Sequence, residues 1–197
     1  HSMGAVLAFE LCRHLRRLQR PLPLHLFVSG YQAPQLQIRS DPIHTLSDAD
    51  FLKALQERYQ GIPPQLLEMP EILELFTPIL RADITLLERY RCGQEPALPC
   101  HMTAMGGEQD PWTTPAYLQP WGAHTTGRFA MRIYPGDHFY LSPLTEAVAK
   151  DKWGIGYGGV AYFAKAPGVK ILSVKKTKDS PAVSPLKNGM PDYSVVY

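Results

Sequence analysis

The chain has 197 residues, 45% of them hydrophobic, and a net charge of +2, a composition typical of one globular domain with a sizeable core. The small net charge excludes a strongly basic nucleic-acid-binding domain. No apolar run approaches the roughly 18 residues that a membrane-spanning helix needs. We therefore expect neither a nucleic-acid partner nor a membrane partner.

The three cysteines argue against a disulfide framework and against a zinc site. Their number is odd, and no two of them have the C-x-x-C spacing; they are Cys12, Cys92 and Cys100. The first residues also lack the basic-then-apolar order of a signal peptide. These patterns predict a protein of the reducing cytoplasm that holds no metal ion.

The basic residues change type along the chain. Residues 1–144 hold eleven Arg, one Lys and fourteen acidic residues, whereas residues 145–197 hold eight Lys, no Arg and four acidic residues. No fold requirement makes a chain exchange one cation for the other at a point, although the two differ physically. The shift predicts two segments of different origin, joined near residues 141–148.

The first elements predict an α/β fold. Residues 5–18 have the apolar spacing of a helix that is buried at its first two turns, and Pro21 and Pro23 end it. Residues 24–29 form an apolar run that predicts a buried strand ending at Gly30. A helix followed closely by a strand is half of an αβ unit, so we expect the α/β class.

The next region, about residues 46–91, is predicted to be helical. Ser47 and Asp48 can cap a helix through Tyr59, and Pro63-Pro64 interrupts the chain. Further helix begins near Glu71, and a last helix carries Ala82, Leu86, Leu87 and Tyr90 at helical spacing. Helix inserted between two strands is typical of a lid over a pocket, and a helical excursion with only a packing role fits the pattern equally well.

Two more strands follow, and a polar residue stands just beyond each. The apolar run at residues 100–105 precedes Asp110, and the run at residues 129–134 precedes His138, with a short helix at 114–122 between them. Open α/β sheets place their chemistry at the carboxyl ends of the strands. Asp110 and His138 are therefore candidate functional residues.

Ser2 completes a possible catalytic triad. It lies in an x-S-x-G stretch at the mouth of the first helix, and this stretch is the later part of the G-x-S-x-G nucleophile elbow. Ser2, Asp110 and His138 follow the Ser…Asp…His order of α/β-hydrolases. His138 would take the serine proton, Asp110 would orient His138, and the Met3 N–H would donate to the oxyanion.

Each of these residues also has an ordinary structural interpretation. Ser-x-Gly is common in turns and helix caps, and an Asp before Pro is common in turns. The occurrence of all three residues in the Ser…Asp…His order, with Asp110 and His138 after successive strands, favours the triad over these separate interpretations. Five other histidines lack such a context, and we expect them to be structural or exposed: His14, His25, His44, His101 and His124.

Five segments carry a resemblance to a known family. They are HSMGA at 1–5, LFVSG at 26–30 followed by AP at 33–34, LRAD at 80–83, GGEQD at 106–110, and GDHF at 136–139. Residues 1–144 resemble the type II thioesterases of non-ribosomal peptide and polyketide synthesis. The resemblance implies an α/β-hydrolase domain with its lid at about residues 46–91, and hydrolysis of acyl thioesters on the phosphopantetheine arm of an acyl or peptidyl carrier protein.

The resemblance also implies the site residues and a shortened domain. Ser2 corresponds to the nucleophile, Asp110 to the acid and His138 to the base, without a cofactor. The family places several strands and a second oxyanion donor before the elbow. We therefore expect an N-terminally truncated domain that contains the C-terminal part of the sheet, and loss of one such donor costs on the order of 10²–10³ in rate.

Residues 145–197 resemble a different family. Their glycines match neither a phosphate loop nor the G-x-G-x-x-G dinucleotide fingerprint, and a short strand is expected at 170–174, followed mostly by loop. The segments AVAKD at 147–151, GIGYGG at 154–159, KAPGVK at 165–170 and PDY at 191–193 resemble an internal piece of the phosphate-binding proteins of ABC transporters. The alternative hypotheses are thus a phosphate-binding module and a chimeric chain without activity.

Overall fold

The chain divides into two compact units in the computed structural model. The described residues are 1–36, 41–59, 70–140 and 149–150, with the backbone of 154–155, 186–187 and 190–191. The first unit combines residues 1–32 with residues 96–197, and the second comprises residues 33–95. The first unit contains the β-sheet, and the described secondary structure of the second unit is helical.

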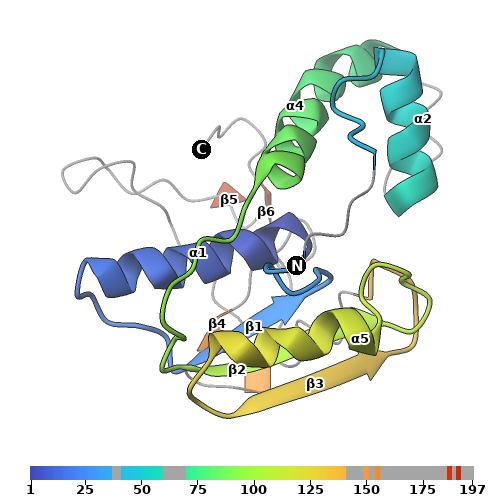
Figure 1. Cartoon of the computed structure of the whole chain (residues 1–197). Helices are drawn as coiled ribbons and strands as arrows, with labels where there is room; N and C mark the ends of the chain where they lie inside the picture. Colours follow the sequence, from blue (N-terminus) through green and yellow to red (C-terminus); the bar gives the residue numbers. More distant parts are fainter. Residues whose placement is uncertain are drawn as a thin grey trace. The chain divides into compact units, whose positions relative to one another are not determined.

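The central sheet of the first unit is parallel. Strands β1 (His25–Ser29), β2 (His101–Gly107), β3 (Phe129–Tyr134) and β4 (Gly154–Ile155) lie in the order β3-β2-β1-β4. The arrows of β1 and β3 point the same way in Figure 1. Three of these strands coincide with the apolar runs in the sequence, and the predicted α/β class is confirmed.

The glycine-dense stretch after residue 153 contributes β4, which its composition did not predict. Gly154 and Ile155 pair in parallel with His25 and Leu26 of β1. Farther along, β5 (Leu186–Lys187) and β6 (Met190–Pro191) form a short antiparallel pair. The strand expected at residues 170–174 lies outside the described residues.

Helix α1 (Met3–Arg17) begins two residues earlier than the apolar spacing predicted and packs against β1. It ends without glycine, because Gln19 adopts the left-handed conformation with φ 53°. The amide of Arg20 donates to the Leu15 carbonyl and that of Gln19 donates to the Arg16 carbonyl. This is the Schellman pattern, and it satisfies two carbonyls that the helix end would otherwise leave unpaired.

The segment between β2 and β3 packs on the same face as α1. It consists of α5 (Pro115–Leu118) and the 3₁₀-helix η1 (Gln119–His124). The buried ring of Phe9 on α1 meets the Trp121 ring edge to face, with 5.2 Å between centroids. The Trp121 indole N–H donates to the Tyr31 carbonyl over 3.0 Å, which satisfies its polar atom inside the core.

The sheet core follows the two-residue period of strands. Leu26 and Val28 of β1 are fully buried, as are their register partners Met102 and Ala104 of β2. Residues two apart on a strand share a face, so these four side chains form one continuous apolar surface. This packing fixes the carboxyl ends of β1 and β2 beside each other.

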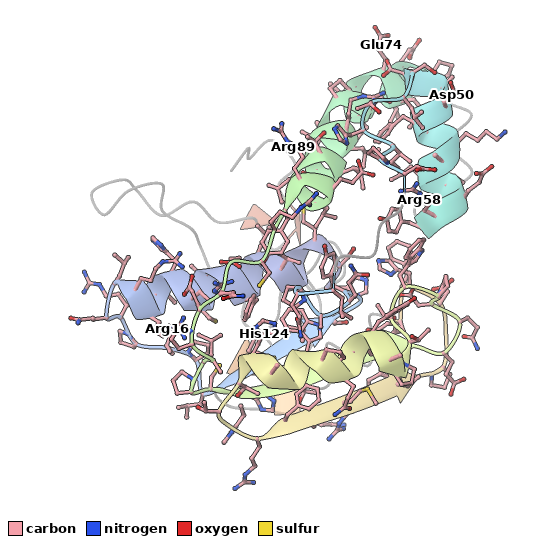
Figure 2. The ribbon with its side chains drawn as sticks, viewed as in Figure 1. Arg16, Asp50, Arg58, Glu74, Arg89 and His124 are labelled. Carbon is pink, nitrogen blue, oxygen red and sulfur yellow. The ribbon has the colours of Figure 1, made fainter. Side chains whose placement is uncertain are left out.

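Two polar side chains of the first unit, Arg16 and His124, also contact distant parts of the chain. The guanidinium of Arg16 on α1 donates to the carbonyls of Pro96 and Ala97, where the chain returns toward β2. His124, at the end of η1, packs its ring against Phe9 with 4.9 Å between centroids. Figure 2 labels both Arg16 and His124.

The second unit is built from α2 (Asp48–Tyr59) and α4 (Pro70–Arg89). The prediction of two separate helices after residue 70 is wrong, because α4 runs unbroken through Pro78. Thr77 and Ile84 are both buried, one beside the proline and one a further two turns along. Packing of this common face keeps the helix continuous despite the missing N–H. The break expected at Pro63-Pro64 lies outside the described residues.

A single carboxylate joins the loop before α2 to α4. Glu88 accepts hydrogen bonds from the amides of Ile43 and His44, at 2.9 and 3.1 Å, and from the His44 ring. Arg58 of α2 lies 3.5 Å from the same carboxylate. Burial by itself would raise the pKa of Glu88, but these bonds and the nearby His44 lower it below its ordinary value.

We expect Glu88→Ala to destabilise this unit by about 1–3 kcal/mol, because the buried Ile43 amide loses its acceptor. Hydrogen exchange of the Ile43 and His44 amides should accelerate. Glu74→Ala is the matched control, since Glu74 is an exposed acid on the same helix, labelled in Figure 2. Equal exchange rates in the two variants would contradict the role of Glu88.

The lowered pKa sets the direction of the pH dependence. The stability that the Glu88 carboxylate contributes is fully present above its ordinary pKa of 4.5 and is lost as the pH falls through the lower folded value. The difference between wild type and Glu88→Ala should therefore shrink on acidification below about pH 4.5.

Candidate active site

Ser2 lies in a strained turn directly before α1. Its backbone adopts φ 51° and ψ −129°, a region that costs a non-glycine residue about 1–3 kcal/mol. The Ser2 amide donates to the Ser29 carbonyl over 2.7 Å, which fixes the turn at the carboxyl end of β1. The chain start and the β1 arrowhead lie together in Figure 1. The Ser2 hydroxyl makes no capping bond to the helix and is therefore available to another partner.

Asp110 lies on the loop after β2 and is almost fully buried. The Trp112 amide donates to one carboxylate oxygen over 3.0 Å. Burial alone would raise the pKa of Asp110, but hydrogen bonds and charge from His138, with smaller contributions from Trp112 and Thr113, hold it below its ordinary value. The carboxylate is therefore ionised at neutral pH.

His138 lies on the loop after β3, and both of its ring nitrogens are engaged. Nδ1 lies 2.7 Å from the Asp110 carboxylate, and Nε2 lies 3.1 Å from the Ser2 hydroxyl. A carboxylate only accepts, so Nδ1 donates to Asp110, and Nε2 of the neutral ring accepts from Ser2. The structure thus brings together the three residues that the sequence singled out, and it does so in the arrangement of a Ser-His-Asp triad.

The loops that carry Asp110 and His138 hold each other. The Glu108 amide donates to the Tyr134 carbonyl, and the Gln109 amide donates to the Gly136 carbonyl. In return the Gly136 amide donates to the Gln109 side chain over 2.7 Å. These bonds fix the relative position of the acid and the base.

Two glycines permit the close approach of these segments. A Cβ on Gly107 would lie 2.2 Å from the Asp137 carbonyl oxygen, which is backbone and cannot yield by rotating. Gly30 follows β1 at φ 65°, and a Cβ there would lie 2.4 Å from the His1 ring. Both positions therefore exclude any larger residue in this arrangement.

The Met3 amide lies where the oxyanion donor was expected, at the first position of α1. The next two amides, of Gly4 and Ala5, donate to the carbonyls of His1 and Ser2. The first amides of a helix have no acceptor within it, and the helix dipole places partial positive charge there. The Met3 N–H thus stands directly after the candidate nucleophile, at a helix end that favours negative charge.

Three residues around the triad were not singled out in the sequence. His1, Ser29 and Tyr140 are buried and joined by hydrogen bonds, with His1 Nδ1 3.0 Å from the Ser29 hydroxyl and that hydroxyl 2.9 Å from the Tyr140 hydroxyl. His1 precedes Ser2, and Tyr140 follows His138 by two positions. For His1 and Tyr140, closeness in sequence to Ser2 and His138 was the signal that could have identified them as part of the site.

The other five histidines lie outside the triad, and four of them have structural contacts. His25 lies 2.9 Å from the Thr103 hydroxyl, His44 bonds Glu88, and His101 accepts from the Arg128 amide. His124 is half-buried against the Phe9 ring, and this partial burial, with Arg13 nearby, lowers its pKa. His14 is exposed on α1.

Among the described residues, no three His, Cys, Asp or Glu side chains are grouped as a metal ion would need. Within the same part of the chain, no helix combines the length and apolarity to cross a membrane.

Comparison with known proteins gives a family. The family model of the thioesterase domain matches residues 1–152. Linear gramicidin dehydrogenase LgrE of Brevibacillus parabrevis is 41% identical over 169 residues, which cover 81% of this chain and 64% of that protein. Gramicidin S biosynthesis protein GrsT of Aneurinibacillus migulanus is 38% identical over 141 residues, which cover 72% of this chain and 55% of that protein.

Solved structures agree with the fold. The type II thioesterase BorB from the borrelidin biosynthetic cluster is 35% identical, with a TM-score of 0.65 over 75% of this chain and 60% of that one. The chain thus spans 55–64% of the length of these relatives. The comparisons give no support to the resemblance of residues 145–197 to phosphate-binding proteins. The match over residues 1–152 assigns this chain to the thioesterase domain family.

Proposed function

We propose that the chain carries the catalytic machinery of a type II editing thioesterase, with Ser2 as nucleophile, His138 as general base and Asp110 as the residue that orients His138. The single observation that supports this most is the unbroken run of hydrogen bonds from the Ser2 hydroxyl through His138 to Asp110. The strained backbone of Ser2 supports it independently, because strain of this kind gathers at active sites.

In the first half of the reaction the acyl group moves to the protein. The Ser2 oxygen attacks the thioester carbonyl carbon while His138 Nε2 takes the hydroxyl proton. The resulting imidazolium is stabilised by the Asp110 carboxylate. When the tetrahedral intermediate collapses, the carbon–sulfur bond breaks and Nε2 returns the proton to the departing sulfur, which leaves as a thiol.

In the second half, water releases the acid. His138 Nε2 takes a proton from a water molecule as its oxygen attacks the acyl-serine carbonyl. Collapse of the second tetrahedral intermediate breaks the bond to the Ser2 oxygen, and Nε2 returns the proton to that oxygen. The products are a carboxylic acid and the regenerated serine.

The Met3 N–H would stabilise both intermediates. Negative charge develops on the former carbonyl oxygen, and the amide after the nucleophile is one of the two donors of an oxyanion hole in α/β-hydrolases. The helix end at Met3 adds its partial positive charge. One such donor is worth on the order of 10²–10³ in rate.

The substrate class proposed is an acyl group held as a thioester on the phosphopantetheine arm of an acyl or peptidyl carrier protein. This follows from relatives whose names place them in gramicidin and borrelidin synthesis, among them a type II thioesterase. The segment at about residues 46–91, which contains α2 and α4, would serve as the lid.

A serine-directed phosphonate tests the nucleophile. We expect one adduct, located by peptide mass spectrometry on the peptide that contains Ser2, and no adduct in the Ser2→Ala variant. Ser47→Ala is the matched control, because that exposed hydroxyl bonds Asp50 in the first turn of α2 and its loss should leave labelling unchanged. Labelling that persists in Ser2→Ala would refute the assignment.

A carrier-bound substrate tests the reaction. An acyl-phosphopantetheinyl carrier protein should release free thiol and carboxylic acid in equal amounts with the wild-type chain and not with Ser2→Ala. A chain that is labelled at Ser2 but cleaves only small-molecule thioesters would refute the carrier-protein substrate and leave the nucleophile assignment intact.

A further inference from the structure

The residue before the nucleophile connects three parts of the site. The buried His1 ring packs against the His138 ring, with 4.9 Å between centroids and 52° between planes. On another side it lies 5.8 Å from the Tyr140 ring, edge on. His1 therefore contacts the candidate base while it is covalently attached to the candidate nucleophile.

A hydrogen-bonded chain fixes the orientation of the His1 ring. His1 Nδ1 lies 3.0 Å from the Ser29 hydroxyl, which lies 2.9 Å from the Tyr140 hydroxyl. The Gly30 amide donates to the Tyr140 oxygen over 3.0 Å. This series of hydrogen bonds thus begins at the Gly30 backbone N–H, whose position is set by the carboxyl end of β1.

One assignment of these bonds uses both hydroxyl protons. The Tyr140 oxygen accepts from the Gly30 amide, the Tyr140 hydroxyl donates to Ser29, and the Ser29 hydroxyl donates to His1 Nδ1. Burial raises the pKa of Tyr140, which keeps the phenol protonated and able to donate. In this arrangement His1 Nδ1 accepts the Ser29 hydroxyl proton.

We propose that His1 is a positioning residue: the chain Gly30–Tyr140–Ser29 fixes its ring, and the ring in turn holds the face of His138 so that Nε2 points at Ser2. This rests on the proposed function, because His138 is the base in that reaction. His1, Ser29 and Tyr140 come from the elbow, the end of β1 and the loop after β3. These three residues therefore connect the elbow that carries the nucleophile with the loop that carries the base, through the end of β1.

The test uses two nearly isosteric variants, Ser29→Ala and Tyr140→Phe, each of which removes one hydroxyl from the 197-residue chain. Each should lower kcat for thioester hydrolysis about tenfold, the rate equivalent of one hydrogen bond, with KM unchanged. The double variant should be no slower than either single variant, since residues in one network are not additive. The control is His25→Phe at the other end of β1, which should retain wild-type kcat.

A second measurement does not depend on turnover. Proton NMR of the His138 Nδ1–H, the proton shared with Asp110, should show about tenfold faster exchange with water in both variants and wild-type exchange in His25→Phe. Unchanged exchange and unchanged kcat in both variants would overturn the proposal, as would fully additive losses in the double variant. If the wild-type chain is neither labelled at Ser2 nor active, the proposed function fails and the exchange measurement still decides the role of His1.

Discussion

The Asp110→Asn variant should lose about 10⁴-fold in kcat for thioester hydrolysis, while substrate binding and the folded structure persist. An amide is the same size as the carboxylate, but its NH₂ group or weaker oxygen no longer enforces a proton on His138 Nδ1. The ring can then present a protonated Nε2 to Ser2, which is the wrong tautomer for a base. Loss of the corresponding carboxylate in a serine protease has an effect of this size.

The measurement is a pH–rate profile of kcat beside a thermal unfolding curve. We expect the rate to fall at every pH between 6 and 9, while the unfolding curve keeps a cooperative transition that shows the variant to be folded. Asp137→Asn is the matched control, because Asp137 is an exposed neighbour of His138 whose carboxylate accepts from the Phe139 amide. A comparable loss in the two variants would show that charge near the loop, and not the bond to His138, is responsible.

The carboxylate also contributes to stability in a defined pH range. Because the folded pKa of Asp110 is lowered, its contribution is fully present above the ordinary value of 3.8 and is lost as the pH falls through the folded value. Wild type and Asp110→Asn should therefore converge in acid-unfolding experiments below about pH 4.

The Gly107→Ala variant should lose more than 10²-fold in kcat and about 1–3 kcal/mol of stability. The new methyl group would meet the backbone oxygens of Gly136 and Asp137, at 2.6 and 2.2 Å, so the loop that carries His138 must move outward. A displacement of about 1 Å is enough to cost 10²-fold in rate.

Gly122→Ala controls for the change of glycine to alanine. The nearest atom to a Cβ there is 3.2 Å away and belongs to the Phe129 side chain, which can rotate. We expect wild-type kcat and a stability change below about 1 kcal/mol. Wild-type activity in Gly107→Ala would show that the loop tolerates the displacement and that the distances around His138 are not limiting.

The elements that could be predicted from the sequence are those whose signal is local. The apolar runs of β1, β2 and β3 and the helix before β1 were located to within about two residues. Asp110 and His138 were found because they follow strand ends, where parallel sheets place functional side chains.

What the sequence did not disclose depends on contacts between distant residues. A proline disfavours the helix interior, yet α4 continues through Pro78 with Thr77 and Ile84 buried on one face. Gly154 and Ile155 carry no strand pattern and pair with β1 because its edge accepts hydrogen bonds. His1 and Tyr140 are 139 positions apart, and nothing in either neighbourhood predicts that Ser29 joins them.

The interlocked loops after β2 and β3 have a consequence for motion within the triad. Asp110 and His138 are carried by segments that exchange three hydrogen bonds, so thermal displacements of the acid and the base are correlated. Ser2 is fastened to β1 instead, through its bond to the Ser29 carbonyl. The His138–Asp110 distance should therefore fluctuate less than the Ser2–His138 distance, which depends on the side-chain contacts of His1.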